Sequence, residues 1–308
     1  MSIEVKNVFK YYGEQAALND VSFKINSGEI VGFLGPNGAG KSTMMKIATC
    51  FLTKSSGTVK VAGLNVENDS IEIRKKIGYL PEHNPLYLDM YVKEYLEFVA
   101  GLYKGRLADG TKFNKRERVT EMINLVGLEK EQNKKIGALS KGYRQRVGLA
   151  QAIIHDPEVL ILDEPTSGLD PNQLVDIRQL ILNIGKTKTV MLSTHIMQEV
   201  EAICDRVIII KDGQLVADDT KAQMQQQGDA KQVIFVEFDK NFSRNQLRQI
   251  QGVNSVKNVD GNQWLFSSTE ADIRPAISKF AQQNDLLVLT MRIEEKSMED
   301  IFKALTGK

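Results

Sequence analysis

Residues 35–43 read Gly-Pro-Asn-Gly-Ala-Gly-Lys-Ser-Thr and match the phosphate-loop pattern G-x-x-x-x-G-K-[ST]. Residues 30–34 just before them are continuously apolar, as in a buried parallel strand, and a helix is expected from Met44 to Phe51. A glycine-rich turn that only happens to contain Lys-Ser would not need a strand before it and a helix after it. The stretch therefore predicts nucleotide binding.

Each part of this loop has a chemical reason. Glycines at positions 35, 38 and 40 allow backbone geometries in which successive N–H groups turn towards a phosphate at a helix N-terminus. Lys41 brings a positive charge to the β- and γ-phosphates, and Ser42 offers a hydroxyl to Mg²⁺. The predicted nucleotide-binding residues are Gly35, Pro36, Asn37, Gly38, Ala39, Gly40, Lys41, Ser42 and Thr43.

The composition is that of a globular protein with about two domains. The chain has 308 residues, of which 42% are hydrophobic, and a net charge of +1 from 40 basic and 39 acidic residues. Because this balance provides no large basic field, no nucleic-acid partner is expected. All apolar runs are far shorter than the roughly 18 residues of a membrane span, so work at a membrane would require another chain. Cys50 and Cys204 are expected to be unpaired thiols in a reducing cytosol.

Polar residues follow two further apolar runs that are typical of buried strands. Residues 159–162 run directly into Asp163-Glu164, and residues 189–193 run into Thr194-His195. Ligands of open α/β sheets bind beyond the carboxyl ends of strands, so these side chains are expected near the phosphate loop. One carboxylate could serve the metal and the other the water. A single histidine is often only structural, and that interpretation stays open for His195.

Two other patterns leave alternatives open. Strands are expected at residues 2–8 and 17–25, and Tyr11 and Tyr12 lie between them, where a ring could stack on a nucleotide base or simply pack in the core. From Pro81 to Pro157 the periodicity becomes helical, with an apolar and partly aromatic face that suits either core packing or a partner. This block is interpreted as a helical insertion in a larger α/β unit.

Residues 139–146 read Leu-Ser-Lys-Gly-Tyr-Arg-Gln-Arg, which resembles the signature motif of ABC ATPases, usually written Leu-Ser-Gly-Gly-Gln. Residues 167–170, Ser-Gly-Leu-Asp, are similar to the D-loop of that family, His195 to its switch histidine, and Tyr12 to the aromatic residue that stacks on adenine. These motifs follow in family order as far as about residue 218. The chain is therefore identified as a member of the ABC ATPases, which implies the α/β fold of the P-loop NTPases.

The resemblance implies ATP and Mg²⁺ as cofactors and a role for each site residue. Glu164 is expected to orient or deprotonate the attacking water, and Asp163 to hold Mg²⁺ together with Ser42. His195 would sense the γ-phosphate. The Q-loop position, where the family usually has Gln, holds Glu82. Its carboxylate can bind Mg²⁺ and take part in catalysis, but it adds negative charge beside the γ-phosphate.

Within the family, the signature of one chain completes the nucleotide site of a second chain. Ser140 and Gly142 keep the hydroxyl and the backbone that face phosphate, although Lys141 and Tyr143 stand where Gly and Gln are commoner. Together with Asp170 of the D-loop they are counted as nucleotide-binding residues. Because the chain has one phosphate loop and one signature, the implied active form is a head-to-tail homodimer with ATP sandwiched at each interface.

The predicted domain organisation has two parts and a linker. Residues 1–218 are expected to form the ATPase domain, with a helical subdomain at about 82–157, and residues 219–230 a linker. Residues 231–308 show the order β-α-β-β-α-β of a small α+β ferredoxin-like domain. A last helix at Met298–Leu305 is similar to the closing helix of ATPases of ABC-2-type exporters.

The resemblance implies the ATP-hydrolysing subunit of a membrane ABC transporter, at the cytoplasmic face of the cell membrane. Its partner would be a polytopic permease, which could dock on residues 84–91 with Leu86 and Tyr87 as apolar anchors, although packing onto the core explains these residues equally well. Residues 79–87 and the tail also resemble gliding-motility-associated ATPases of the exporter group. Two alternatives are a soluble ABC ATPase acting on ribosomes or DNA, and an importer ATPase, against which the tail argues mildly.

Overall fold

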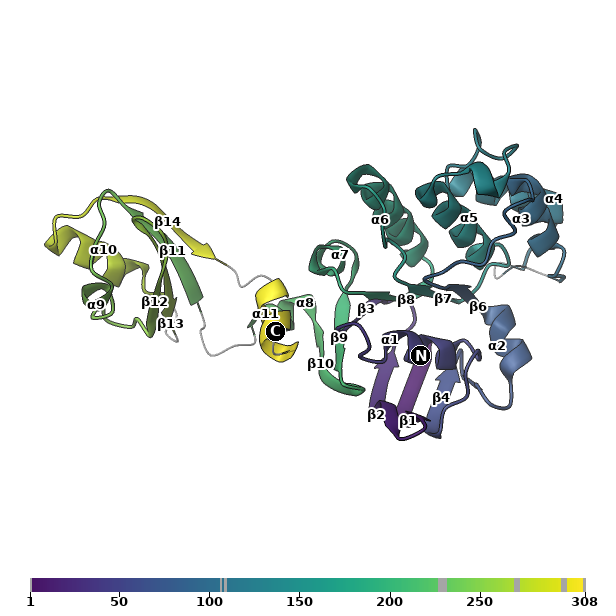
Figure 1. The fold of residues 1–308 in the computed structure, drawn as a ribbon, viewed down its shortest axis with the longest axis horizontal. Helices are drawn as coiled ribbons and strands as arrows, with labels where there is room; N and C mark the ends of the chain where they lie inside the picture. Colours follow the sequence, from purple (N-terminus) through teal and green to yellow (C-terminus); the bar gives the residue numbers. More distant parts are fainter. Residues whose placement is uncertain are drawn as a thin grey trace. The chain divides into compact units, whose positions relative to one another are not determined.

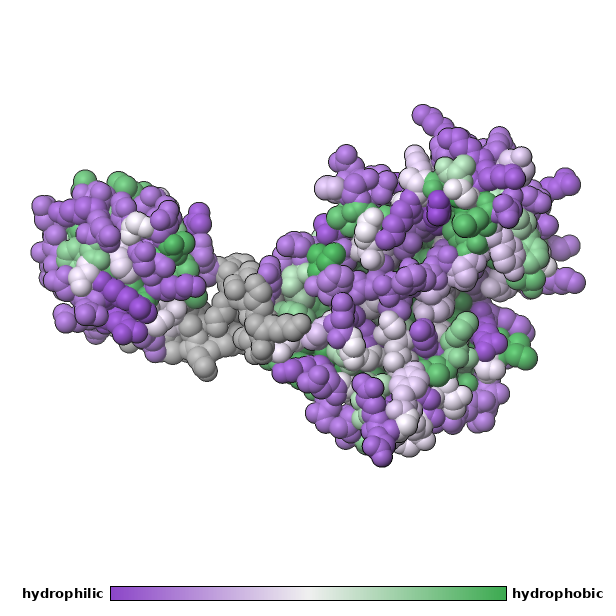
Figure 2. All heavy atoms as spheres, viewed as in Figure 1, coloured by the Kyte–Doolittle hydropathy of each residue, from purple (hydrophilic) through white to green (hydrophobic). Residues whose placement is uncertain are grey.

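The computed structural model describes residues 2–105, 107, 110–226, 232–268, 272–294 and 298–306. The chain divides into two compact units, Met1–Lys221 and Ala222–Lys308, which are described separately (Figure 1). Hydrophilic residues cover most of the face of each unit that Figure 2 shows, as expected when the apolar residues form buried cores. The first unit contains every nucleotide-site motif found in the sequence.

A mostly parallel sheet forms the centre of the first unit. Its strands lie in the order β10-β9-β3-β8-β7-β6. Their bounds are β3 Ile30–Leu34, β6 Ile77–Leu80, β7 Val159–Asp163, β8 Thr189–Thr194, β9 Arg206–Lys211 and β10 Gln214–Thr220. Every residue of β3, β7 and β8 is buried, as in parallel strands that are covered on both faces. Because these three strands pair in parallel, their carboxyl ends meet at one edge.

A second, antiparallel sheet lies on the other side of the first helix. Its strands, in the order β2-β1-β4-β5, are β1 Ile3–Tyr12, β2 Gln15–Ile25, β4 Ser56–Val61 and β5 Leu64–Asn65. Helix α1, Lys41–Ala48, lies between the two sheets in Figure 1, with Met44 and Met45 fully buried in the shared core. The expected strand ending at residue 8 instead continues as β1 to Tyr12, so Tyr11 and Tyr12 lie in the hairpin with β2.

Helices occupy the other side of the central sheet. Figure 1 shows α3, α4, α5 and α6 on the side away from α1. The helices of this unit are α1, α2 Ser70–Lys76, α3 Val92–Ala100, α4 Lys115–Leu125, α5 Lys141–Ile153, α6 Pro171–Gly185, α7 Met197–Ile203 and the one-turn η1 Ile136–Ala138, followed by α8 Lys221–Gln226 at the boundary. The helical periodicity expected from Pro81 to Pro157 corresponds to α3, α4 and α5, whereas no sequence pattern pointed to α2, α6 or α7.

The second unit has its own core. Its strands are β11 Gln232–Phe238, β12 Ser255–Asp260, β13 Gln263–Ser268 and β14 Val288–Glu294, and its helices are α9 Arg244–Leu247, α10 Arg274–Gln283 and α11 Met298–Thr306. The antiparallel strand order β12-β13-β11-β14 is that of a ferredoxin-like sheet, which confirms the predicted fold. Phe238, Trp264 and Phe266 are buried in the core against α10 residues such as Ile277.

The region between the units differs in part from the prediction. Strand β10 extends to Thr220, so the first residues of the expected linker pair with β9 instead. Residues 227–230 of that linker lie outside the described residues. Asp212 and Gly213 form the turn of the hairpin between β9 and β10, because both have positive φ and Lys211 pairs with Gln214.

Two expectations from composition can be compared with the structure. Cys50 and Cys204 are both free, and Cys204 is buried. Among the helices of the described residues, none combines the length and the apolar character that crossing a membrane requires.

Gly78→Ala is expected to destabilise the first unit. Gly78 lies in β6 against α5, and a Cβ built on it would stand only 2.1 Å from the backbone oxygen of Ala152. Because backbone must then move, we expect a loss of about 3 kcal/mol in the free energy of unfolding, measured by urea denaturation. Gly13→Ala, where φ is +59° but a Cβ meets open space, is the control and should lose about 1 kcal/mol. Equal losses would contradict the close contact of β6 with α5.

Candidate functional site

The phosphate loop occupies residues 35–40, between the end of β3 and the start of α1. Its glycines are needed for two separate reasons. Gly38 and Gly40 have φ of +81° and +107°, which few other residues adopt. A Cβ on Gly35 would lie 2.3 Å from the backbone oxygen of Ile210, and one on Gly40 would lie 2.5 Å from that of Ala17. The loop therefore fits closely between β9 and β2 only because these side chains are absent.

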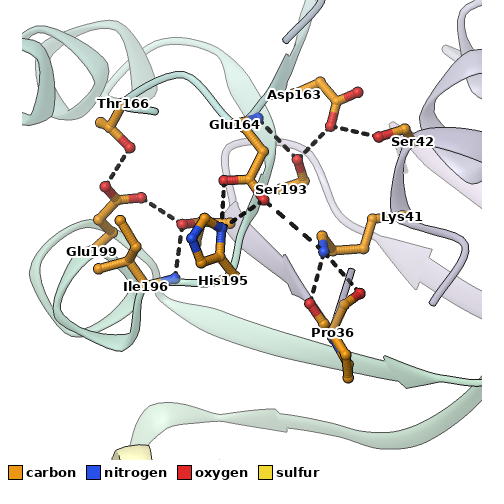
Figure 3. A network of polar contacts seen from close by, with 12 residues as sticks. Pro36, Lys41, Ser42, Asp163, Glu164, Thr166, Ser193, His195, Ile196 and Glu199 are labelled. Atoms are coloured by element: carbon orange, nitrogen blue, oxygen red, sulfur yellow. Dashed lines mark hydrogen bonds and ion pairs between the residues drawn. The ribbon is translucent and has the colours of Figure 1, made fainter. Parts of the chain in front are cut away.

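The backbone of the phosphate loop holds the Lys41 side chain through hydrogen bonds (Figure 3). Its side chain is only 7% exposed, and its Nζ donates hydrogen bonds to the backbone oxygens of Gly35 at 2.7 Å and Pro36 at 3.1 Å. Glu164 Oε1 lies 4.0 Å from the same nitrogen. Burial lowers the pKa of Lys41, and the charges of Glu164, Asp163 and Glu82 act against that shift. The loop thus holds a cation in place before any phosphate arrives.

Asp163 connects the phosphate loop to the neighbouring strand. The hydroxyl of Ser42 donates to Asp163 Oδ1 at 3.1 Å, and the hydroxyl of Ser193 donates to the same oxygen at 2.6 Å. Mg²⁺ commonly uses one or two protein ligands and completes its shell with phosphate oxygens and water. A hydroxyl and a carboxylate side by side fit that pattern. Within the described part of the chain no group of three or more His, Cys, Asp or Glu side chains could hold a metal without such help.

Glu164 is placed in an unusual backbone conformation. Its φ is +49°, a region that non-glycine residues seldom occupy, and its N–H donates to the Ser193 hydroxyl at 2.9 Å. His195 Nδ1 lies 3.1 Å from Glu164 Oε1 and 3.0 Å from Oε2, so it donates to the carboxylate when it carries the proton. Burial raises the pKa of Glu164, against the hydrogen bond and charge of His195 and the charge of Lys41. Figure 3 shows Glu164 between Lys41 and His195.

A further set of buried groups supports these residues and was missed in the sequence. Glu199 on α7 is fully buried, accepts a hydrogen bond from the Thr194 hydroxyl at 2.6 Å, and accepts a short one from Thr166. It therefore links the segment after Glu164 to the residue before His195. One sequence feature could have revealed this buried role. Glu199 stands among the apolar positions Met197, Val200 and Ile203 of the helix that follows His195.

A cavity of about 450 Å³ brings many of the predicted residues together. Glu82 joins it from the segment after β6, while Glu164 and His195 join it from the ends of β7 and β8. Its lining residues are Ala17, Asn37, Gly38, Gly40, Lys41, Ser42, Thr43, Glu82, Glu164, Ser167 and His195. Asp163 lies on an adjoining cavity of about 420 Å³ that shares Ser42 and Glu82 with the first. The volume and polar lining suit a phosphate-bearing ligand.

Other predicted residues do not line this cavity. Tyr12 is 51% exposed at the end of β1, with Lys10 Nζ 5.2 Å from its ring centre. Ser140 is the N-cap of α5 and accepts the Tyr143 N–H at 3.4 Å. Asp170 is the N-cap of α6 and accepts the N–H groups of two α6 residues at 3.1 and 3.0 Å.

Three more residues that were predicted to bind nucleotide, Pro36, Ala39 and Gly142, take part in the packing of the loop or of the signature helix. Pro36 accepts the N–H of Ala39 at 3.1 Å, and Ala39 is buried. A Cβ on Gly142 would lie 2.5 Å from the Gln173 side chain, so the signature helix packs closely on α6. Within one chain, therefore, Ser140, Gly142 and Asp170 lie outside the lining of the phosphate cavity, whereas Ser167 of the D-loop is part of it.

Known proteins resemble this chain over most of its length. Residues 18–167 match the family described as ABC transporter. The chain is 30% identical to the bacitracin transport ATP-binding protein BcrA of Bacillus licheniformis, over 99% of this chain and 97% of that protein. It is 36% identical to the Nod factor export ATP-binding protein I of Burkholderia orbicola (strain AU 1054), over 70% of each. The solved dimeric structure of the ATP-binding cassette MJ0796 with ADP and Pi is similar over 71% of this chain and 98% of that chain, at 30% identity and a TM-score of 0.63.

Ser193→Ala is expected to destabilise the site directly. It leaves the buried N–H of Glu164 without its acceptor and removes one donor from Asp163. We expect a loss of about 2 kcal/mol in the free energy of unfolding, measured by chemical denaturation. Thr120→Ala removes a hydroxyl from the exposed face of α4 and is the control, with a loss below about 0.5 kcal/mol. If the two variants were equally stable, the Ser193 hydroxyl would not hold the two carboxylate residues together.

Proposed function

The chain belongs to the family of ABC transporter ATP-binding subunits, which are ATPases, and from that premise we propose that it drives export through a separate polytopic membrane subunit. The observation that carries the proposal is the cavity in which Lys41, Ser42, Glu164 and His195 converge. A cation, a hydroxyl, a buried carboxylate and a histidine at one helix N-terminus suit a nucleoside triphosphate and an attacking water.

We assign the reaction to this chain's own groups. Lys41 stabilises the charge on the β- and γ-phosphates and exchanges its carbonyl partners for phosphate oxygens. Glu164 orients the water and accepts its proton, because a carboxylate with a raised pKa is a stronger base than an ordinary one. His195 fixes the Glu164 carboxylate from the other side. Catalysis is then mainly positioning and charge stabilisation.

Ser42 and Asp163 would hold Mg²⁺, and Glu82, which lines the same cavity, could supply a further oxygen. When bound, the metal would neutralise charge on the β- and γ-phosphates. The Ser193 hydroxyl keeps Asp163 oriented towards Ser42, so that the two oxygens stay adjacent. This arrangement needs the nucleotide's own phosphates to complete the metal shell.

A head-to-tail homodimer is part of the proposal. Ser140 and Asp170 are exposed, and with Gly142 they lie outside the cavity of their own chain. They remain available to the nucleotide of a second chain, as the resemblance to the family implies. The dimeric state of the similar cassette MJ0796 supports this assignment. ATP would then close the dimer and hydrolysis would reopen it.

The membrane subunit is proposed to dock on an apolar groove of the helical block. A cavity of about 330 Å³ there is lined by Tyr87, Phe98, Leu102, Tyr103 and His155, among others. Tyr87 is 55% exposed and lies edge-on to Tyr95 at 5.8 Å between ring centres. Leu86, expected from the sequence to be a second docking anchor, is instead only 9% exposed, so it offers little surface to a partner. A charge at Leu86 would test folding and not docking.

Export is favoured over the other functions by the relatives. Nod factor export ATP-binding protein I is named for export, and BcrA, named for bacitracin transport, aligns over nearly its whole length, including the region of the second unit. An importer ATPase or a soluble ATPase on ribosomes or DNA has no comparable support. The resemblance of residues 79–87 and the tail to the gliding-motility-associated ATPase GldA remains a narrower form of the same proposal.

Glu164→Gln is the test of the ATPase assignment. It keeps the size of the side chain but removes the base, so we expect turnover to fall by about a hundredfold or more while Mg-ATP still binds. Steady-state phosphate release and equilibrium nucleotide binding measure the two effects. Glu158→Gln, the same change on an exposed residue that pairs with Lys76, is the control and should leave both unchanged. Near-normal turnover of Glu164→Gln would move the base to another residue.

Leu102→Asp is the test of the docking groove. Leu102 is 68% exposed in the groove, so the charge should leave the fold and the basal ATPase activity intact while opposing burial against an apolar helix. We expect the variant to be lost from the membrane fraction of cells that contain the partner. Ile71→Asp on α2 is a matched control, because Ile71 is also 68% exposed but does not line the groove. Normal membrane association of Leu102→Asp, or its loss in both variants, would overturn the proposed surface.

A further inference from the structure

A second cleft adjoins the phosphate cavity and is lined by charged residues of both signs. It has a volume of about 730 Å³ and lies between the segment after β6 and the first turn of α5. Glu82, Asn84, Lys141, Arg144 and Ser167 are among its lining residues. Glu82 also lines the phosphate cavity, so it belongs to both spaces. Any charge that acts on Glu82 through the cleft therefore acts on the nucleotide site.

Glu82 and Lys141 are the two charges in question, and within the described residues neither forms an ion pair or a side-chain hydrogen bond. The other cation of the cleft is Arg144, which keeps its charge. Its guanidinium donates hydrogen bonds to the backbone oxygens of Leu139 at 3.0 Å and Gly137 at 3.1 Å. The first turn of α5 has no acidic residue that could neutralise Lys141. The carboxylate that shares the cleft with Lys141 is Glu82.

Lys141 is an exposed residue, but its side chain lies against the D-loop. A Cβ built on Gly168 would lie 2.3 Å from Lys141 Nζ, 3.4 Å from its Cε and 3.6 Å from its Cδ. The lysine chain therefore lies along the D-loop at a residue with no side chain. Since φ at Gly168 is +69°, glycine is also the residue its backbone favours. This packing reduces the rotamer freedom of Lys141 and keeps its charge at the cleft.

We propose that Lys141 is the counter-charge of Glu82 and thereby a positioning residue that keeps the nucleotide site able to bind ATP. The inference rests on the proposed function. An unbalanced carboxylate at position 82 would repel the γ-phosphate and compete with it for Lys41. A lysine in the adjoining cleft offsets that repulsion, because charges within about 10 Å still interact at moderate ionic strength.

Two of the departures of this chain from its family's usual motifs then compensate each other in charge. Glutamate in place of the usual Q-loop glutamine adds one negative charge, and lysine in place of the usual signature glycine adds one positive charge. Both residues line the second cleft, and Glu82 lines the phosphate cavity as well.

A double-mutant cycle tests the coupling. Glu82→Gln and Lys141→Met each remove one charge at nearly constant shape, and methionine can keep the packing along Gly168. Equilibrium affinity for Mg-ATP is measured for the parent, both single variants and the double variant, at low and high salt. We expect Lys141→Met to weaken binding about fivefold when Glu82 is present and less than about twofold when Gln is present, with the difference shrinking in high salt. Lys141→Arg should retain parent affinity.

Two outcomes would overturn the inference. Equal effects of Lys141→Met in both backgrounds would show that the lysine acts independently of Glu82, and a salt-independent loss would show a packing role at Gly168. Lys130→Met, at an exposed position of the helical block, controls for the loss of one charge on the chain and should leave affinity unchanged. Phosphate release by the parent chain is measured separately. Absence of hydrolysis would count against the proposed function, whereas the binding cycle would still decide the coupling.

Discussion

The parallel pairing of β3, β8 and β7 is the constraint on which the rest of the site depends. In this register Leu34 lies opposite Thr194, and Asp163 lies opposite Ser193. The phosphate loop, Glu164 and His195 follow directly after these positions, and Asp163 is itself one of them. A shift of one residue would turn each of these side chains to the other face of the sheet, so the register of these fully buried strands fixes the chemistry of the site.

Buried charges at this sheet edge are balanced against one another. Burial lowers the pKa of Lys41 and raises that of Glu164, so each ion alone would be costly to keep charged. Their separation of 4.0 Å, together with hydrogen bonds to carbonyls and to His195, offsets that cost. Preorganised groups of this kind lose little freedom when a phosphate and a water arrive, which is the physical basis of catalysis by positioning.

Helix α5 brings several parts of the nucleotide site into contact. Its N-terminus carries the signature residues, its Gly142 packs against Gln173 of α6, and Lys141 lies along Gly168 of the D-loop. Further along, Gly148 allows Asn84 of the segment after β6 to approach so closely that a Cβ there would stand 1.8 Å from its amide nitrogen. Because Glu82 lies two residues before Asn84, a movement of this segment at the nucleotide site would also move α5. The segment thereby connects the helical block to the nucleotide site.

The sequence by itself determined the phosphate loop, β3, the strands that carry Asp163, Glu164 and His195, and the order of elements in the second unit. These features are local, because glycine spacing, apolar runs and turn residues are each read within a few positions. Contacts between distant residues were decided only by the tertiary structure. They include the Ser193 bridge, buried Glu199, the burial of Leu86 and the exposed place of Tyr12 at a hairpin. The shared cleft of Glu82 and Lys141 also belongs to this group, since residues 59 positions apart in the chain meet only when β6 and α5 pack side by side.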